Sequence, residues 1–390
     1  MTDKTASPNS ISSIMMMHTP SNAGYAISEL EKLFFDTGMV LSGGDSSKIH
    51  FSYKTLTPGR PETLPAAFAN YIPLDFTSCP DADLLRIEEY VRSNGIQLAI
   101  IFDLQPVHPI IDALRRGGVE TVVGYYGCQI SSLMPPWKLW IKRLMFHLAK
   151  HKMDGLIFES HAMADLAILG RGVPSERVDI VPLGIDTDEY QPQQSKLIHE
   201  LFSFPEDRKV VVYAGHMEAR KGVATLIQAA IELLVNKKRT DVCFALFGNR
   251  PGESAVYEEM YLGKGVDNLI RFGGYRSDLN ELFPGCYCGV IPSTGWDSFT
   301  RSSMEMAACG LPIIVSDTGG LPETIEDQRT GIVYPAGDVE KLAEAIELLL
   351  DNPTLAASYA AAGRERCVKS YSKEVQKRSF LGAVQKRIKH

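Results

Sequence analysis

The sequence lacks several features that would assign it to a specialised class of protein. It contains no uninterrupted apolar run of about 18 residues, so we expect no transmembrane helix. Residues 1–13 are polar and lack the basic segment and long apolar stretch of a signal peptide. The seven cysteines form no C-x-x-C pair, and their odd number argues against a disulfide framework. These absences predict a cytoplasmic protein, either free or peripheral to the inner face of a membrane.

Positive charge is also in deficit. The chain has 40 Lys and Arg against 47 Asp and Glu, a net charge of −7, so we expect no nucleic-acid partner. The apolar fraction of 45% and the charged fraction of 22% are ordinary for a globular protein. A chain of 390 residues is too long for one ordinary core, which predicts two domains.

Short apolar runs alternate with helix-length segments along most of the chain. We expect buried strands at residues 12–18, 98–102, 121–124, 155–158, 178–181, 209–214, 242–247, 269–272, 289–291 and 312–315. These runs are continuous, as in parallel strands covered on both faces. Helical patterns lie at residues 26–35, 84–93, 109–116, 224–235, 302–309 and 339–350. The alternation predicts an α/β protein with doubly wound parallel sheets.

One domain boundary is legible in the sequence. Residues 181–186 (V-P-L-G-I-D) end a strand, and the polar stretch that follows contains two prolines. We place the linker near residues 184–205, which gives an N-terminal domain of residues 1–185 and a C-terminal domain of residues 186–371. The basic segment 372–390 is expected to form a helix that crosses back onto the first domain.

The most informative stretch is residues 293–335. A strand ends at Ile291, a loop follows, and a helix begins near Ser302. The first N–H groups of this helix and its dipole favour a phosphate, and ligands of open α/β sheets bind at such strand ends. Glu305 lies one turn inside the helix, where it can accept hydrogen bonds from vicinal hydroxyls. Asp297, on the loop, can bind a second polar group.

This stretch resembles the C-terminal signature of the retaining GT-B glycosyltransferases of family 4, the glycosyl transferases group 1. In that signature two acidic residues eight positions apart flank a Phe-Gly pair; here they fall on Asp297 and Glu305, with Phe299 and Thr300 between them. Further segments resemble the family's pattern in order and spacing: residues 181–186, 214–222, 308–312, 319–323 and 330–331.

The resemblance implies two Rossmann-like domains facing across a cleft. The C-terminal domain would hold a nucleotide diphosphate sugar, and the N-terminal domain would hold the acceptor. Glu305 would bind the ribose hydroxyls, and Lys221 with the backbone of Thr300 and Arg301 would bind the diphosphate. Lys221 and a helix N-terminus would stabilise the charge on the departing diphosphate without a metal or another cofactor.

Other donor contacts are implied in the same way. Asp297 would touch the hydroxyls of the transferred sugar, and the base would lie against Arg271 and Phe272 at a strand end. His216 stands where the family has a basic residue, so the leaving-group charge would rest more on Lys221, Arg220 or Arg301.

Other departures concern single side chains. Asp297 is one methylene shorter than the family's usual glutamate, and Thr300 replaces the family's glycine. Each candidate also has an ordinary alternative: Asp297 can order its loop, Lys221 can be an exposed lysine, and His216 can cap backbone groups at a strand end.

The N-terminal domain contributes further candidates. The loop at residues 19–25 resembles the family's glycine-rich first loop, with Asn22 and Gly24 facing donor and acceptor. Tyr126 replaces the family's histidine after a strand; it can hydrogen-bond a sugar hydroxyl but, with a reference pKa of about 10, is a poor base. The alternative for Tyr126 is a scaffold role.

Three polar residues follow another strand end of the same domain. Asp103, Gln105 and His108 would line the acceptor side, and scaffold roles are again the alternative.

Residues 135–150 form an amphipathic and basic helical pattern. Trp137, Ile141, Leu144 and Leu148 share one stripe. We favour a helix docked on its sheet, with the two tryptophans covering the seam. The alternative is peripheral contact of residues 135–152 with an anionic membrane, giving access to a lipid-linked acceptor.

The sequence thus predicts a retaining, metal-independent transferase that moves a hexose-type sugar from a nucleotide diphosphate sugar to a hydroxyl. A UDP-sugar is the favoured donor, and the acceptor is a saccharide, a lipid-linked saccharide or a small molecule. Two alternatives stay open: another GT-B enzyme, such as an epimerase or phosphorylase, and a non-catalytic protein that binds a sugar nucleotide.

Overall fold

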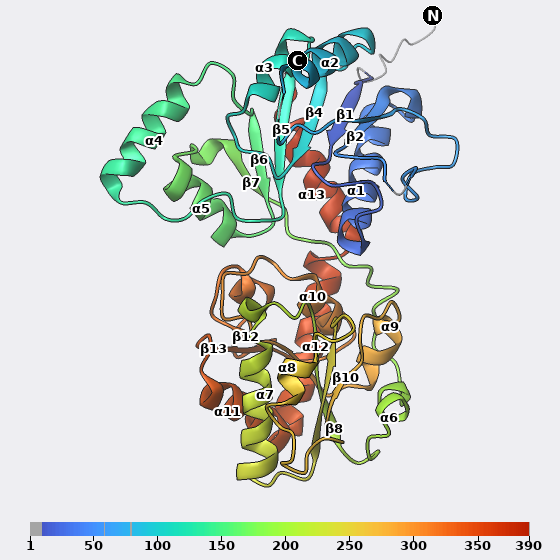
Figure 1. The fold of residues 1–390 in the computed structure, drawn as a ribbon, viewed down its shortest axis with the longest axis vertical. Coiled ribbons are helices and arrows are strands. Elements are labelled where there is room, and N and C mark those ends of the chain that lie inside the picture. The colour runs from blue at the N-terminus through green and yellow to red at the C-terminus, as the bar shows by residue number, and fades with distance from the viewer. Residues whose placement is uncertain (1–9, 58, 79, 390) are drawn as a thin grey trace, which may run out of the picture. The chain divides into compact units, whose positions relative to one another are not determined.

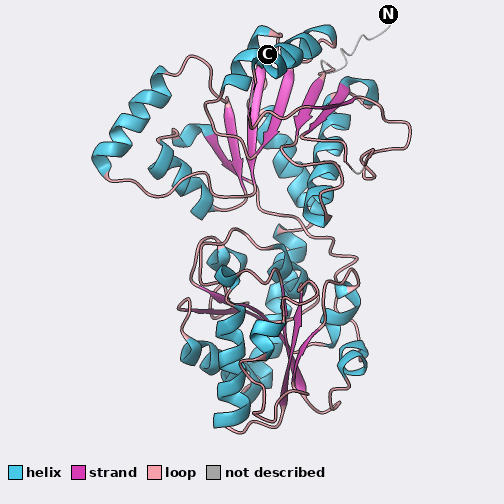
Figure 2. Cartoon of the chain, viewed as in Figure 1, coloured by secondary structure: helices cyan, strands magenta, loops and turns pink. Residues whose placement is uncertain are grey.

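The computed structural model describes residues 10–57, 59–78 and 80–389. The chain divides into two compact units: unit 1 is Met1–Val181 with Lys377–His390, and unit 2 is Pro182–Gln376. Each unit contains one sheet flanked by helices (Figures 1 and 2).

Unit 1 is built on a parallel sheet of seven strands in the order β3-β2-β1-β4-β5-β6-β7. The strands are β1 (Ser13–Met16), β2 (Ile49–Tyr53), β3 (Tyr71–Pro73), β4 (Leu98–Phe102), β5 (Thr121–Tyr126), β6 (Gly155–Phe158) and β7 (Val178–Ile180). Its helices are α1 (Tyr25–Leu41), α2 (Asp81–Ser93), α3 (Pro109–Arg116), α4 (Pro136–Leu148), α5 (His161–Arg171) and the greater part of α13 (Lys373–Gln385). The short 3₁₀ turns η1 (Ser46–Lys48) and η2 (Ser175–Arg177) precede β2 and β7.

Unit 2 is built on a parallel sheet of six strands in the order β10-β9-β8-β11-β12-β13. The strands are β8 (Lys209–Ala214), β9 (Val242–Phe247), β10 (Ile270–Phe272), β11 (Cys288–Ile291), β12 (Ile313–Ser316) and β13 (Gly331–Tyr334). The longer helices are α6 (Leu197–Phe202), α7 (Val223–Ile231), α10 (Arg301–Ala308), α11 (Val339–Asp351) and α12 (Pro353–Ser370). Shorter helical turns are η3 (Ala219–Lys221), the π-helix η4 (Glu232–Asn236), α8 (Ala255–Glu258), α9 (Leu279–Leu282), η5 (Phe283–Gly285) and η6 (Leu321–Thr324).

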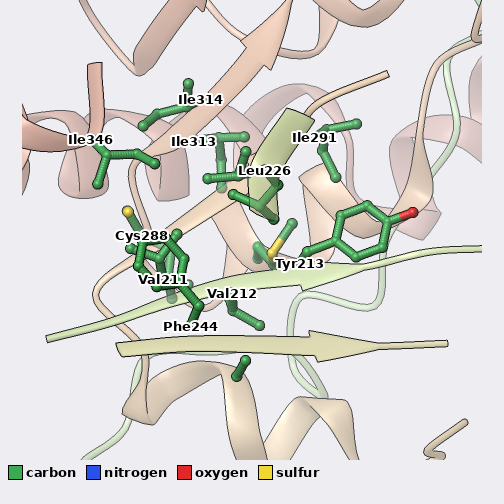
Figure 3. Packing of buried hydrophobic residues seen from close by; sticks show 14 of the residues in the cluster. Val211, Val212, Tyr213, Leu226, Phe244, Cys288, Ile291, Ile313, Ile314 and Ile346 are labelled. Carbon is green, nitrogen blue, oxygen red and sulfur yellow. The ribbon is translucent and has the colours of Figure 1, made fainter. Parts of the chain in front are cut away.

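The core of unit 2 lies on both sides of its sheet. Every residue of β9, β11 and β12 is buried, because helices cover both faces of a parallel sheet. Figure 3 shows Val211 and Val212 of β8 beside Phe244 of β9, with Leu226 of α7 packed nearby. This continuous burial explains the uninterrupted apolar runs in the sequence.

The chain passes between the two units twice. It leaves unit 1 after Val181, four residues before the expected boundary at residue 185, and returns at Lys377 instead of residue 372. Two backbone hydrogen bonds join the two passing segments and keep both of them in unit 2. The Ile185 N–H donates to the Tyr371 carbonyl at 2.7 Å, and the Lys373 N–H donates to the Ile185 carbonyl at 3.0 Å.

Helix α4 contradicts the interpretation that we favoured for it. The side chains that were to cover a seam on the sheet face solvent instead: Trp137 is 63% exposed and Trp140 is 65% exposed. Helix α4 is attached through Leu139 and Phe146, which are buried. Among the described residues, no helix is both long enough and apolar enough to cross a membrane.

Candidate active site

The candidate site lies where the strand order of unit 2 reverses. Strands β8 and β11 are neighbours in the sheet, yet the chain leaves β8 toward β9 on one side and leaves β11 toward β12 on the other. The chain thus leaves these two strands for opposite sides of the sheet, and open α/β sheets bind ligands at the carboxyl ends of their strands at such a point. Residues 215–222 follow β8, and residues 292–300 follow β11.

An ion pair joins these two loops. Lys221 Nζ lies 2.8 Å from Asp297 Oδ2 and 3.0 Å from Oδ1, and both side chains are largely buried. The Ser293 hydroxyl donates to Asp297 Oδ2 at 2.8 Å, and the Ser298 N–H donates to Oδ1 at 3.1 Å. A carboxylate this buried needs such partners. Asp297 thus orders its own loop, the alternative named from the sequence, and also positions the Lys221 ammonium.

The backbone holds the two loops together around that pair. Gly222 has φ +71°, and a Cβ there would lie 1.7 Å from the Pro292 carbonyl oxygen, so only glycine fits. The N–H groups of Thr294 and Gly295 both donate to the Arg220 carbonyl, at 2.8 and 3.0 Å. The position of Lys221 is therefore set by contacts of its neighbours with the opposite loop.

A third loop, after β12, closes against Asp297. Gly319 has φ +57°, and a Cβ there would lie 2.0 Å from the Asp297 carbonyl oxygen. The Gly320 N–H donates to that same oxygen at 2.8 Å, and the Ser316 hydroxyl donates to the Ser293 carbonyl at 2.6 Å. The roles of Ser293 and Ser316 were not foreseen. Their only sequence signal is a small polar residue at or just beyond a strand end.

The N-terminus of α10 directly follows the loop that carries Asp297. Thr300 is its N-cap, and the Thr300 side chain makes no capping hydrogen bond. The Thr300 hydroxyl is instead 2.8 Å from Ser303 Oγ. The first N–H groups of a helix carry partial positive charge, so this end is suited to an anion.

The other residues predicted on this helix are held by the protein. Arg301 Nη1 donates to the Gly184 carbonyl at 3.1 Å, which directs the guanidinium toward the segment entering unit 2. Glu305 is buried in α10, and Phe299 is buried against the ring of Tyr371. The structure thus places Glu305 one turn behind the anion-favouring end.

Two other predicted basic residues, Arg220 and His216, lie on the loop that carries Lys221. Arg220 Nη1 is 3.8 Å from Asp297 Oδ1 and 3.2 Å from the Trp296 carbonyl, and its Nε pairs with Glu218 at 2.7 Å. The carbonyl of His216 accepts the Tyr213 hydroxyl at 2.7 Å, which fixes the loop just after β8. Arg220 therefore joins Lys221 and Asp297.

The residues predicted to meet the base lie farther along the sheet. Arg271 and Phe272 are on β10, the edge strand, and β9 separates them from β8. Arg271 is exposed, and the ring of Phe272 stacks on Tyr257 with centroids 6.1 Å apart. Their contact with a base remains a prediction.

The candidates in unit 1 are engaged in structural hydrogen bonds. Asn22 Nδ2 donates to the Arg60 carbonyl at 3.0 Å, and its Oδ1 accepts the Glu62 N–H at 2.8 Å, so this side chain fastens a neighbouring loop. Gly24 begins α1 with φ +108°, a conformation that favours glycine.

The polar residues after β4 also hold backbone. Asp103 accepts the Gly127 N–H at 2.9 Å, and burial raises the pKa of its carboxyl. His108 caps α3 by accepting the Ile110 N–H, and burial lowers the pKa of its imidazole. Gln105 is partly buried beside them. Asp103 and His108 thus take the scaffold roles given as the alternative.

The structure corrects the role expected for Tyr126. Its side chain is fully buried on β5, and its hydroxyl donates to the Leu104 carbonyl at 2.7 Å. Burial raises the pKa of the phenol well above its usual value. The reason is that β5 extends through Tyr126, so the residue lies inside the sheet and not on the loop beyond it. A contact with a sugar hydroxyl is excluded in this arrangement.

We expect Tyr126→Phe to leave turnover within about twofold of the wild type and to lower stability. The variant loses one buried hydrogen bond, worth about 1 kcal/mol net, and leaves the Leu104 carbonyl without that donor. Chemical unfolding and steady-state kinetics measure the two effects. A loss of turnover above tenfold with unchanged stability would restore a catalytic role to this hydroxyl.

Comparison with known proteins agrees with this fold. The family described as Glycosyl transferases group 1 matches residues 208–352. The alpha-maltose-1-phosphate synthase of Mycolicibacterium smegmatis is 30% identical over 284 residues, 67% of this chain and 67% of that protein. A solved glycosyltransferase of Rickettsia africae superposes with a TM-score of 0.79 at 16% identity, over 98% of this chain and 100% of that one. HepE of Anabaena, solved in complex with UDP-glucose, superposes with a TM-score of 0.71 at 16% identity, over 96% of this chain and 100% of that one.

The two kinds of similarity support different statements. Superposition along nearly the whole length at low identity shows the fold, which is the GT-B fold of two parallel-sheet domains. The sequence identity to the synthase, over two thirds of both chains, shows the family. The chain belongs to the group 1 glycosyl transferases, family 4 of the glycosyltransferases.

Proposed function

We propose that this glycosyltransferase moves a hexose-type sugar from a nucleotide diphosphate sugar to an acceptor hydroxyl, with retention of configuration and without a metal. The proposal rests above all on the Lys221 ammonium, held 2.8 Å from Asp297, whose loop leads into the N-terminus of α10. A lysine and a helix N-terminus together supply the positive charge that a departing diphosphate needs.

In the proposed complex the diphosphate lies at the N-terminus of α10 and takes Lys221 as a counter-ion. Glu305 accepts hydrogen bonds from the ribose hydroxyls. Asp297, whose carboxylate is then shared with the hydroxyls of the sugar, orients the anomeric carbon. The nucleoside extends along the strand ends toward β10 and the ring of Phe272.

The proposed transfer exchanges one bond for another on the same face of the sugar. The bond between the anomeric carbon and the diphosphate oxygen breaks, and a bond from that carbon to the acceptor oxygen forms. The acceptor proton passes to an oxygen of the leaving phosphate, which makes a separate base unnecessary. This route is consistent with the burial of Tyr126, which removes the side chain expected next to the acceptor.

The donor is proposed to be a UDP-sugar. Support comes from HepE, which has the same fold and was solved in complex with UDP-glucose. We propose a saccharide, lipid-linked or small-molecule acceptor, and no nucleic-acid partner.

A donor screen tests the proposed function. We expect UDP and UDP-sugars to raise the melting temperature more than GDP or ADP, because a ligand stabilises the folded state in proportion to the logarithm of its saturation. Turnover on a panel of acceptors should be unchanged in EDTA, and NMR of the product should show the anomeric configuration of the donor. Loss of turnover in EDTA would contradict metal independence, and an inverted product would contradict retention.

The same assay separates the alternatives. Release of nucleotide without any acceptor would favour an epimerase, and dependence on inorganic phosphate would favour a phosphorylase. Binding of nucleotide without turnover on any acceptor would favour a non-catalytic partner protein.

A further inference from the structure

Helix α4 presents an apolar stripe to solvent. Its exposed apolar side chains recur at helical spacing, three and four residues apart: Trp137, Trp140, Ile141, Leu144, Met145 and Leu148. Leu148 is 71% exposed. A helix in a globular protein normally turns such a stripe toward the core. Here the stripe is the outer face.

The opposite side of α4 attaches the helix to unit 1. Leu139 and Phe146, seven residues apart and so two turns along one face, are buried. Helix α4 packs against α5, and Gly172 at the end of α5 comes so close that a Cβ would lie 2.6 Å from the Arg143 backbone nitrogen. Figure 1 shows α4 at the margin of unit 1, beyond α5. Helix α4 is therefore packed onto unit 1 while its apolar stripe remains exposed to solvent.

Positive charge surrounds this stripe. Residues 127–153 contain five lysines and arginines and no aspartate or glutamate, in a chain whose net charge is −7. Lys138 and Arg143 are exposed on the helix itself, and Lys150 is exposed just beyond it. Lys138 Nζ lies 5.2 Å from the centre of the Trp137 ring, so charge and aromatic surface adjoin directly.

A cavity of about 760 Å³ opens under the same helix. Trp140, Leu144 and Phe146 give it an apolar side, and Arg143, Lys152 and Arg177 give it a cationic side. The cavity shares Trp140 and Leu144 with the stripe and so extends its apolar and cationic surface.

We propose that α4 binds the surface of an anionic lipid bilayer, with the tryptophan stripe buried among the acyl chains and the flanking lysines and arginines on the headgroups. Interfacial helices combine these two features. A second copy of the chain fits the surface less well, because a two-fold dimer brings a patch onto itself and would set cation against cation.

Vesicle binding tests the proposal on the full chain. We expect co-sedimentation with vesicles of equal parts phosphatidylcholine and phosphatidylglycerol, with an affinity at least about tenfold above that for phosphatidylcholine alone. Tryptophan emission should shift to the blue on binding, because two of the three tryptophans lie on α4. Trp137→Gln with Leu148→Gln should weaken binding about tenfold or more. Lys138→Glu with Lys142→Glu should remove the preference for the anionic vesicles.

Helix α2 of the same unit supplies matched controls. Leu85 is 66% exposed and Arg86 is exposed, so Leu85→Gln with Arg86→Glu makes equivalent changes away from α4 and should leave vesicle binding unaltered. Sedimentation of wild type and Trp137→Gln/Leu148→Gln to the same extent would overturn the proposal. So would a wild-type dimer that this pair of substitutions converts to a monomer, since a second copy would then be the partner.

The outcome is independent of the proposed transferase function. Nucleotide-induced thermal shifts, measured on the same preparations, should be equal for wild type and Trp137→Gln/Leu148→Gln. Failure of vesicle binding with normal nucleotide shifts would reject only the membrane surface. Vesicle binding without any nucleotide shift would reject only the donor site.

Discussion

Lys221→Met is expected to lower turnover by about a hundredfold to a thousandfold. Removal of one group that stabilises a developing negative charge has an effect of this size. The substitution also leaves Asp297, which is largely buried, without its main counter-ion, so the free energy of unfolding should fall by an amount on the order of 3 kcal/mol. Steady-state kinetics and chemical unfolding measure the two effects separately.

A double substitution distinguishes catalysis from folding. Lys221→Met with Asp297→Asn removes both charges of the pair and should recover most of the lost stability, while turnover stays at least as low as in the single variant because Asp297 is also proposed to orient the sugar. Lys237→Met is the matched control, because it breaks a surface pair with Glu347 at 2.6 Å elsewhere in unit 2. That change should cost at most about 1 kcal/mol and leave turnover unaltered. Recovery of turnover in the double variant would show that Lys221 serves the fold alone.

Glu305→Gln is expected to abolish most of the thermal shift produced by the nucleotide. A hydrogen bond to a charged acceptor contributes about 1.5–3 kcal/mol, so Kd should rise about tenfold to a hundredfold. Glutamine conserves the shape of this buried side chain, which keeps the fold of α10 intact. The measurement is a titration of UDP followed by thermal unfolding or calorimetry.

An exposed carboxylate on α11 provides the control for Glu305→Gln. Glu344→Gln removes an exposed carboxylate of α11 that pairs with Lys341 at 2.7 Å, and nucleotide binding should not change. A Glu305→Gln variant with wild-type nucleotide affinity would show that the ribose is bound elsewhere. The position of the whole nucleotide at α10 would then be wrong.

Most of the sheet could be predicted because parallel strands are buried on both faces. Strands β8 and β9 coincide with the predicted spans, and β12 is shifted by one residue from its span of 312–315; each contains an uninterrupted apolar run. Strand β2 was missed because His50 and Ser52 interrupt its apolar run. His50 is tolerated in the core because Nδ1 lies 2.9 Å from the Tyr90 hydroxyl, on a helix 40 residues later. No local pattern reveals such a distant partner.

Helix α12 was missed for a different reason. Its Pro353–Ser370 segment is rich in alanine and has no strong apolar periodicity. Alanine favours the helix through backbone propensity, which a search for apolar stripes does not detect.

The sequence predicted which residues belong to the candidate site better than it predicted the contacts between them. Lys221 and Asp297 were identified separately, as contacts for the diphosphate and for the sugar. Their pairing joins residues 76 positions apart and depends on the close backbone approaches at Gly222 and Gly319. These approaches depend on how the loops fold together.

The remaining errors concern which way a side chain points. Tyr126 belongs to β5, which extends two residues beyond the predicted strand and is buried on both faces. For α4, the stripe was recognised but assigned to the sheet, since amphipathic periodicity says that a helix has two faces and not which of them meets the protein.

The pairing of Lys221 with Asp297 has a consequence for ligand selection. Because this lysine already has an anion, an incoming phosphate must displace a carboxylate that is tethered beside it at 2.8 Å. Small free anions, such as inorganic phosphate or sulfate, compete poorly with the Asp297 carboxylate, because its attachment to the chain gives it a high effective concentration. Under the proposed function, only a ligand also held through its ribose and base gains enough binding free energy to displace Asp297 from Lys221. Asp297 thereby acts as an internal competitor for Lys221, and this competition favours the complete nucleotide over its fragments.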